Sequence, residues 1–114
     1  AHATDWCGVT SGKDYNKFEK TGLTPRQAQI VQAPYVDESP LCIECKAREI
    51  VRLGSHDMFI ADVVNLLADD RYIDPSTGAF DMQKANLLVY SHGHYYEMGR
   101  EIGKFGWSVQ KKNK

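Results

Sequence analysis

The sequence predicts a mainly β domain with short helices and antiparallel strands. Residues 41–53 alternate between apolar and polar side chains, and residues 58–67 form a second apolar run of strand length. The remaining helical patterns are brief and interrupted by glycine or proline, and short turns join the strands, which is typical of antiparallel sheets. With 114 residues, of which 42% are hydrophobic and 25% charged, we expect residues 1–114 to form a single domain.

The first forty residues are expected to hold only short elements. Asp14 is a suitable N-cap for a helix that continues to Lys20, and Gly22 is its expected C-terminal stop. Proline fixes φ and keeps the preceding residue out of the helical region. The polar stretch that follows is therefore expected to be extended, with prolines at Pro25, Pro34 and Pro40.

The two central strands are predicted to differ in burial. In residues 41–53 the apolar set is Ile43, Cys45 and Ala47, and it alternates with Glu44, Lys46 and Arg48. A period of two indicates a strand with one buried and one exposed face. Residues 58–67 are more continuously apolar, so we expect this strand to be the more central one, after a turn at Gly54-Ser55.

The last third of the chain is predicted to hold smaller pieces. Residues 75–78 form a turn, residues 81–86 one helical turn and residues 87–90 a third strand. A short helix is expected over residues 97–104 and an edge strand over 105–109. Three or four strands leave an open sheet edge, so the pattern indicates part of a larger barrel.

The charge and the cysteine content of the chain bear on its expected partners and location. Fourteen basic and fifteen acidic residues give a net charge of −1, so we expect no nucleic-acid partner and no membrane surface. The basic end, residues 111–114, is expected to be a solvated terminus. No apolar run approaches the ~20 residues of a membrane helix. Three cysteines favour reduced thiols and a cytoplasmic setting.

Cys42-Ile43-Glu44-Cys45 has the spacing of redox and zinc sites, which place both sulfurs on a tight turn or helix start. On a strand, residues three apart face opposite sides of the sheet. We expect the two cysteines to act as small buried hydrophobic residues, with a zinc or dithiol site as the alternative.

Histidines occur in two blocks. His92 and His94 could chelate a metal, but hydrogen bonding at the edge of a cofactor explains both residues with fewer assumptions, and we expect no metal. His56-Asp57 either places one of its side chains in a cleft as an acid–base group or forms a turn whose aspartate caps backbone amides. Aromatic residues cluster around the second block: Tyr90, Tyr95, Tyr96, Phe105 and Trp107. Polar residues interleave with them, which suits a ring-binding pocket, and core packing is the alternative for about half of the aromatic residues.

These blocks occur in the order of a known pattern. Ala3-Thr4-Asp5-Trp6-Cys7-Gly8-Val9 with Ser11-Gly12-Lys13-Asp14, then Gly54-Ser55-His56-Asp57-Met58-Phe59, then Tyr90-Ser91-His92-Gly93 and Gly103-Lys104-Phe105-Gly106, resemble the flavin reductase-like, FMN-binding split-barrel family, close to its flavoredoxin-type members. The resemblance covers essentially all of the chain. Trp6 stands where the pattern usually has tyrosine or phenylalanine, and Lys13 stands where it usually has arginine.

The resemblance implies a split β-barrel that binds FMN non-covalently, usually in a homodimer, and passes electrons between NAD(P)H or another donor and flavin or a redox protein acceptor. It places His56 near the nicotinamide as the expected catalytic residue. The residues that it implies for cofactor binding are Ser11, Gly12, Lys13, Tyr90, His92, Tyr95 and Tyr96.

Family members carry a first half that supplies several strands and most flavin contacts, and this chain begins after it. The expected fold is therefore the C-terminal part of a split barrel, completed by an N-terminal half or by a partner chain. We expect a fragment of a longer product; a truncated product that pairs with another chain, and a first half on a separate polypeptide, are alternatives. A non-catalytic flavin-binding electron-transfer module, or a fragment that only dimerises, is the alternative to a flavin reductase.

Overall fold

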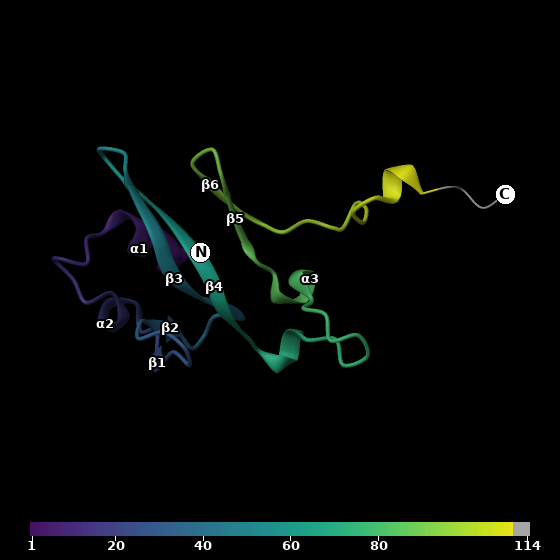
Figure 1. Ribbon diagram of the computed structural model, residues 1–114, viewed down its shortest axis with the longest axis horizontal. Helices are drawn as coiled ribbons and strands as arrows, with labels where there is room; N and C mark the ends of the chain where they lie inside the picture. Colours follow the sequence, from purple (N-terminus) through teal and green to yellow (C-terminus); the bar gives the residue numbers. More distant parts are fainter. Residues whose placement is uncertain (111–114) are drawn as a thin grey trace. The chain divides into compact units, whose positions relative to one another are not determined.

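The computed structural model describes residues 1–110 (Figure 1), and the predicted basic terminus at residues 111–114 lies outside the described residues. The contacts divide the chain into two compact units, Ala1–Asp81 and Met82–Lys114, which are described separately below. Among residues 1–110, no helix has both the length and the apolar composition needed to cross a lipid bilayer.

Two short helices begin the first unit. Helix α1 (His2–Val9) was not predicted, because Ala1 gives it no side-chain cap. Helix α2 (Lys17–Thr21) starts later than predicted: its N-cap is Asn16 rather than Asp14, and the Asn16 side chain accepts a hydrogen bond from the Glu19 N–H at 3.5 Å. The predicted stop at Gly22 is confirmed, with φ 72°.

The proline-rich stretch forms a small hairpin, as its extended pattern predicted. Strand β1 (Pro25–Gln27) pairs antiparallel with strand β2 (Pro34–Val36). The pairing is supported by an ion pair of 3.1 Å between Arg26 Nε and an Asp37 carboxylate oxygen. The loop between these strands, residues 28–33, contains Ala28, which is buried.

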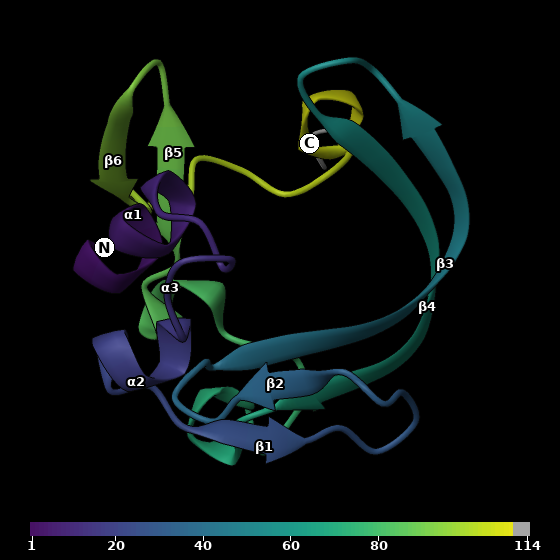
Figure 2. The same ribbon diagram turned by 90° about the vertical axis from the view of Figure 1, so that its left-hand side faces the viewer.

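The two predicted central strands are confirmed as a long antiparallel hairpin. Strand β3 (Leu41–Arg52) and strand β4 (Asp57–Ala68) have 12 residues each. Figure 2 shows this hairpin as a curved ribbon, with β1 and β2 beside its lower end. In the described part of the chain β4 pairs with β3 alone, so the expectation that β4 is central is wrong.

Two register shifts keep apolar residues on one side of the hairpin. The pairing skips Val64 in β4 and Arg48 in β3, as expected for β-bulges. Without the shift at Arg48, Ile50 would fall on the opposite side from Ile43, because neighbouring residues alternate between faces. We define the apolar face by the residues that the register places together: Ile43, Cys45, Ala47, Ile50, Phe59, Ala61, Val63 and Leu66.

The prediction of a half-buried strand is wrong about which side is covered. Ile43 is 54% exposed and Phe59 63% exposed, whereas Glu44, on the other side, is 4% exposed. The β1–β2 loop covers the Glu44 side. Nothing among the described residues of the first unit covers the apolar face to a similar extent, which is why its residues remain exposed.

The first unit ends in turns. A 3₁₀ helix, η1 (Asp70–Tyr72), follows β4, and the predicted turn over residues 75–78 is confirmed by a hydrogen bond of 2.8 Å from Gly78 N–H to the Asp74 carbonyl. Tyr72 and Phe80 bring their rings to within 6.2 Å of each other beside the isolated bridge between Ile73 and Phe80.

The described part of the second unit begins with one helical turn and a small hairpin. Helix α3 (Met82–Ala85) confirms the predicted turn of helix, and strand β5 (Leu88–Ser91) confirms the third strand. Strand β6 (His94–Glu97) pairs with β5 and takes up Glu97, where a helix was expected to start. Residues 98–104 are irregular, so the expected helix over 97–104 is wrong.

The expected edge strand over residues 105–109 is also wrong. Instead, Trp107–Val109 forms a 3₁₀ helix, η2, after Gly106, whose φ is 80°. A Cβ atom at Gly103 would lie 2.6 Å from Trp107 Nε1, so the indole folds back onto the glycine backbone. A larger residue at position 103 would require the Trp107 indole to move. The predicted class, mainly β with short helices, is nevertheless confirmed.

Candidate functional site

The first three predicted cofactor-binding residues, Ser11, Gly12 and Lys13, lie in the turn after α1. The Ser11 carbonyl accepts hydrogen bonds from Asp14 N–H and Tyr15 N–H, each at 3.2 Å. Ser11 Oγ accepts a hydrogen bond of 3.2 Å from Lys13 N–H. A serine hydroxyl that accepts a bond can still donate its own proton. The turn therefore offers the hydroxyl and the exposed Lys13 ammonium group to an incoming anion.

The turn is connected to α2 through Lys17. Lys17 Nζ donates a hydrogen bond to the Cys7 carbonyl, in the last turn of α1. A cation at this end of a helix is favourable because the carbonyl end of the helix dipole is negative. This contact fixes the direction in which the chain leaves α1 and so helps to position residues 11–13.

His56 lies at the tip of the β3–β4 hairpin. The connection is closed by a hydrogen bond of 2.9 Å from Leu53 N–H to the His56 carbonyl, and Gly54 has φ 90°. Ser55 Oγ and His56 Nδ1 lie 3.0 Å apart in a hydrogen bond. The predicted turn at Gly54-Ser55 is thus confirmed, and it exposes the imidazole.

The three tyrosines of the aromatic cluster lie in the β5–β6 hairpin, Tyr90 on β5 and Tyr95 and Tyr96 on β6. His92 and Gly93 occupy its turn with φ 50° and 80°, the backbone of a type I′ turn. Strand β6 was not predicted, although a residue that tolerates positive φ followed by glycine was an available signal for this hairpin.

The pairing sorts the predicted cofactor-binding residues between two faces. Tyr90 is opposite Tyr95, and their ring centroids are 5.2 Å apart. Tyr96 is opposite Val89, on the other face of the ribbon, where its ring lies 6.3 Å from that of His94. Tyr90 and Tyr96 are 63% and 52% exposed, so each face of the hairpin offers one accessible ring.

The cysteine pair is divided between the two sides of β3, as its strand setting predicted. Cys42 Sγ lies 3.5 Å from the Val36 carbonyl on the covered side, whereas Cys45 belongs to the apolar face. The expectation that both cysteines are buried is wrong: Cys42 is half-buried, and Cys45 is exposed because that face is uncovered. No group of three metal-ligating side chains converges among residues 1–110.

Glu44 was predicted to lie in the exposed polar row of its strand, but the structure gives it a structural role. Its carboxylate accepts hydrogen bonds from three consecutive backbone N–H groups, those of Gln29, Ile30 and Val31, at 2.9, 2.7 and 3.2 Å. Asn65 Nδ2, across the hairpin, donates a fourth at 3.3 Å. Burial acts to raise the pKa of Glu44, but these hydrogen bonds outweigh it and hold the pKa below its usual value.

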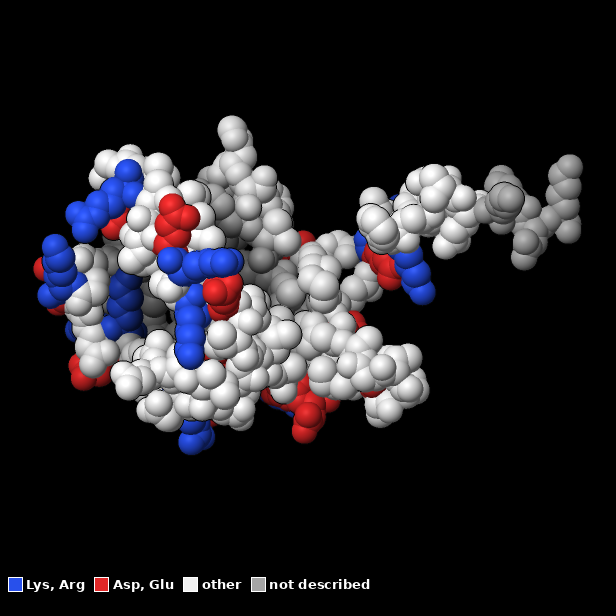
Figure 3. Space-filling view, in the orientation of Figure 1, with Lys and Arg blue, Asp and Glu red and all other residues white. Residues whose placement is uncertain are grey.

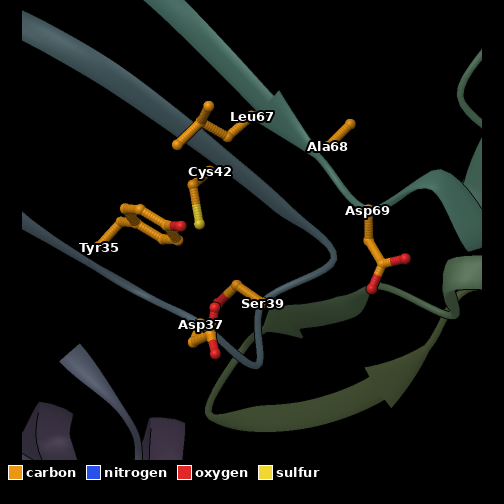
Figure 4. Close-up of a pocket in the computed structure, with 7 residues that line it drawn as sticks. All are labelled: Tyr35, Asp37, Ser39, Cys42, Leu67, Ala68 and Asp69. Carbon is orange, nitrogen blue, oxygen red and sulfur yellow. The ribbon is translucent and has the colours of Figure 1, made fainter. Parts of the chain in front are cut away.

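A polar cavity of about 180 Å³ lies between residues 35–42 and residues 67–69, at the end of β4 (Figure 4). The Cys42 sulfur points toward the hydroxyl end of Tyr35, and the Leu67 side chain lies on the other side of Cys42. The other lining residues are Asp37, Ser39, Ala68 and Asp69.

Both carboxylates of the cavity already have cationic partners. Asp37 pairs with Arg26. Hydrogen bonds from the Arg71 side chain and backbone lower the pKa of Asp69 to about 2. None of the predicted site residues lines this cavity.

On the face shown in Figure 3, basic and acidic side chains are interspersed.

Comparison with known proteins identifies the relatives of this chain. The model of the family described as "Flavin reductase like domain" matches residues 1–99. An uncharacterized protein of Bacillus subtilis, YdfE, is 32% identical over 107 residues, which are 85% of this chain and 47% of that protein. The chain thus spans about half the length of the curated relatives that it matches.

Several solved structures share its fold. Flavoredoxin of Desulfovibrio vulgaris superposes with a TM-score of 0.86 and 28% identity, over 96% of this chain and 59% of that one. A split-barrel-domain protein of Shewanella frigidimarina, assigned as a flavin reductase, gives a TM-score of 0.71 and 26% identity, over 90% of this chain and 52% of that one. The described strands thus match part of a split barrel and do not close one by themselves.

Proposed function

Because this chain belongs to the flavin reductase-like family, we propose that it forms part of an oxidoreductase that binds FMN and passes electrons between NAD(P)H or another donor and flavin or a further acceptor. The observation that carries this proposal is the family match over residues 1–99 together with the structural similarity to flavoredoxin. The reaction of the whole protein requires polypeptide that corresponds to the remaining length of these relatives.

The chemistry of the described residues fits FMN. A phosphate needs donors and positive charge, and the turn of residues 11–13 offers a serine hydroxyl and the exposed ammonium group of Lys13. A flat ring needs aromatic faces, and Tyr90 and Tyr96 provide accessible ones. We assign phosphate binding to Ser11, Gly12 and Lys13, and contacts at the rim of the ring to Tyr90, His92, Tyr95 and Tyr96.

When bound, the flavin supplies the electron-transfer chemistry, and the protein contributes binding, orientation and exclusion of water. We assign to His56 a role in binding the electron donor, because it is exposed at a hairpin tip, where its imidazole can hydrogen-bond a nicotinamide. His56→Ala should therefore slow NAD(P)H oxidation.

The partner that we propose is polypeptide of the same domain type. The apolar face and the open sheet edges would be covered when the remaining half of the barrel pairs with this chain, within a homodimer. A redox protein is the proposed acceptor, and the free thiols of Cys7, Cys42 and Cys45 support the cytoplasm as the location. We propose no nucleic-acid or membrane partner.

The direct test is spectroscopic. Purified protein is mixed with FMN, freed of unbound flavin, and its visible absorbance is followed anaerobically as NADH or NADPH is added. Retention of a yellow flavin spectrum that bleaches with the donor supports the proposal. A colourless protein that takes up no added FMN contradicts it, and a bound flavin that is not reduced by either nucleotide indicates the non-catalytic module instead.

Replacing Lys13 by alanine is expected to weaken FMN binding about tenfold, because the phosphate loses a charge-assisted contact. Riboflavin lacks the phosphate, so its affinity should not change. Fluorescence titration with both flavins measures the two effects. Lys13→Arg should retain affinity, and Lys20→Ala, on α2, is the matched control; equal losses for FMN and riboflavin would refute the phosphate role.

A further inference from the structure

Two histidines, His56 and His94, each have a hydrogen-bond partner at Nδ1, and the two partners differ in whether they can donate. His56 Nδ1 lies 3.0 Å from a hydroxyl oxygen, Ser55 Oγ. His94 Nδ1 lies 3.0 Å from a backbone carbonyl oxygen, that of His92. In a neutral imidazole one nitrogen carries the proton and the other accepts, so the partner at Nδ1 decides what Nε2 can do.

A carbonyl oxygen can only accept a hydrogen bond. His94 Nδ1 must therefore carry the proton when it bonds to the His92 carbonyl, and the Nε2 of neutral His94 is an acceptor. His94 thus provides an internal reference in which the tautomer follows directly from the contact.

The hydroxyl of Ser55 can donate or accept, and relative basicity decides which it does. A neutral imidazole nitrogen is far more basic than an alcohol oxygen, so the stronger arrangement has the Ser55 O–H donating to Nδ1. The proton of His56 then resides on Nε2, the ring nitrogen farthest from the backbone. Because Ser55 and His56 both belong to the short connection closed by Leu53 and His56, their side chains remain adjacent.

We infer that Ser55 is a positioning residue that sets the His56 tautomer, so that His56 presents Nε2–H as a neutral hydrogen-bond donor to an amide carbonyl of the electron donor. This inference rests on the proposed function, and it excludes a general-base role for His56 in its resting state. The matching ligand group is the carboxamide oxygen of a nicotinamide, which accepts one hydrogen bond without exchanging a proton.

The tautomer can be measured without cofactor or turnover. Long-range ¹H–¹⁵N correlation spectra of the purified protein at pH 8 report which ring nitrogen is protonated, and His56→Gln identifies the His56 signals. We expect His56 as the Nε2–H form and His94 as the Nδ1–H form. Ser55→Ala should convert His56 to a mixture while His94 is unchanged, and Ser55→Thr should restore the single form; an unchanged His56 signal in Ser55→Ala would overturn the inference.

Turnover measurements test the consequence for the electron donor. The amide nitrogen of glutamine lies near the position of Nε2, whereas that of asparagine lies near Nδ1. His56→Gln should therefore keep activity within about threefold, and His56→Asn should lose about tenfold, as expected for one hydrogen bond. Ser55→Ala should raise the KM for NAD(P)H about threefold with kcat unchanged, and Ser108→Ala is the control.

The tautomer measurement and the turnover measurement together distinguish failure of this inference from failure of the proposed function. If wild-type protein shows the expected tautomers but oxidises neither nucleotide, the reductase proposal and the assigned ligand fail while the Ser55 contact stands. If it turns over but Asn substitutes for His56 better than Gln, the Nε2 assignment is wrong and the reductase proposal stands.

Discussion

Replacing Glu44 by alanine is expected to lower the melting temperature of the protein by on the order of 10 °C. The carboxylate of Glu44 accepts hydrogen bonds from three consecutive backbone N–H groups of the β1–β2 loop and from the Asn65 side chain. Alanine removes the acceptor that these donors share. Because residue 44 is only 4% exposed, water cannot readily replace the lost carboxylate. The loop should then separate from β3.

The same contact predicts a pH dependence of stability. Because the folded-state pKa of Glu44 lies below its ordinary value of 4.5, the contribution is fully present above about pH 4.5 and is lost as the pH falls through the folded-state pKa. Glu44→Gln cannot titrate. The melting temperatures of the wild type and of Glu44→Gln should therefore differ most at neutral pH and converge in acid.

Thermal unfolding followed by circular dichroism between pH 3 and pH 7 measures both effects. Glu49→Ala is the matched control, because Glu49 is also on β3 but is exposed. A Glu44→Ala variant as stable as Glu49→Ala, or a difference from Glu44→Gln that is constant across this range, would show that the carboxylate does not hold the loop.

Glu44 also shows where inference from the sequence stops. The alternation in residues 41–53 identifies the strand, because the period of side-chain direction is a local property of the chain. Which face is covered depends on distant residues: the N–H donors come from 13 to 15 positions earlier in the chain. Alternation alone assigned Glu44 to solvent and Ile43 to the core, and the reverse is observed.

In the candidate site, too, local features could be predicted from the sequence and features that depend on strand pairing could not. The turn that exposes His56 follows from glycine and serine chemistry and could be predicted. The separation of Tyr90 from Tyr96 depends on the β5–β6 register, which could not be derived once β6 was missed. The bulge at Arg48 has no sequence signal that we recognise, yet it decides that Ile50 joins the apolar face.

The second large effect is expected at that face: replacing Phe59 by aspartate should weaken association of the protein at least about a hundredfold. Phe59 is 63% exposed and lies opposite Ile50, which is 52% exposed, at the end of the apolar face nearest the hairpin tip. A large uncovered apolar surface with open sheet edges is typical of an interface. A carboxylate buried there without a partner would oppose association.

Native mass spectrometry and sedimentation over a concentration series measure the association, and retained flavin absorbance reports whether the cofactor site is completed. Ile50→Asp should reproduce the loss, because Ile50 and Phe59 form one cross-strand pair and their effects should not add. Ile60→Asp is the matched control: Ile60 is next to Phe59 on β4, but the register places it on the opposite face, paired with Glu49. If all three variants associate and retain flavin equally, or if only Ile60→Asp is affected, the apolar face is not the surface through which this domain is completed.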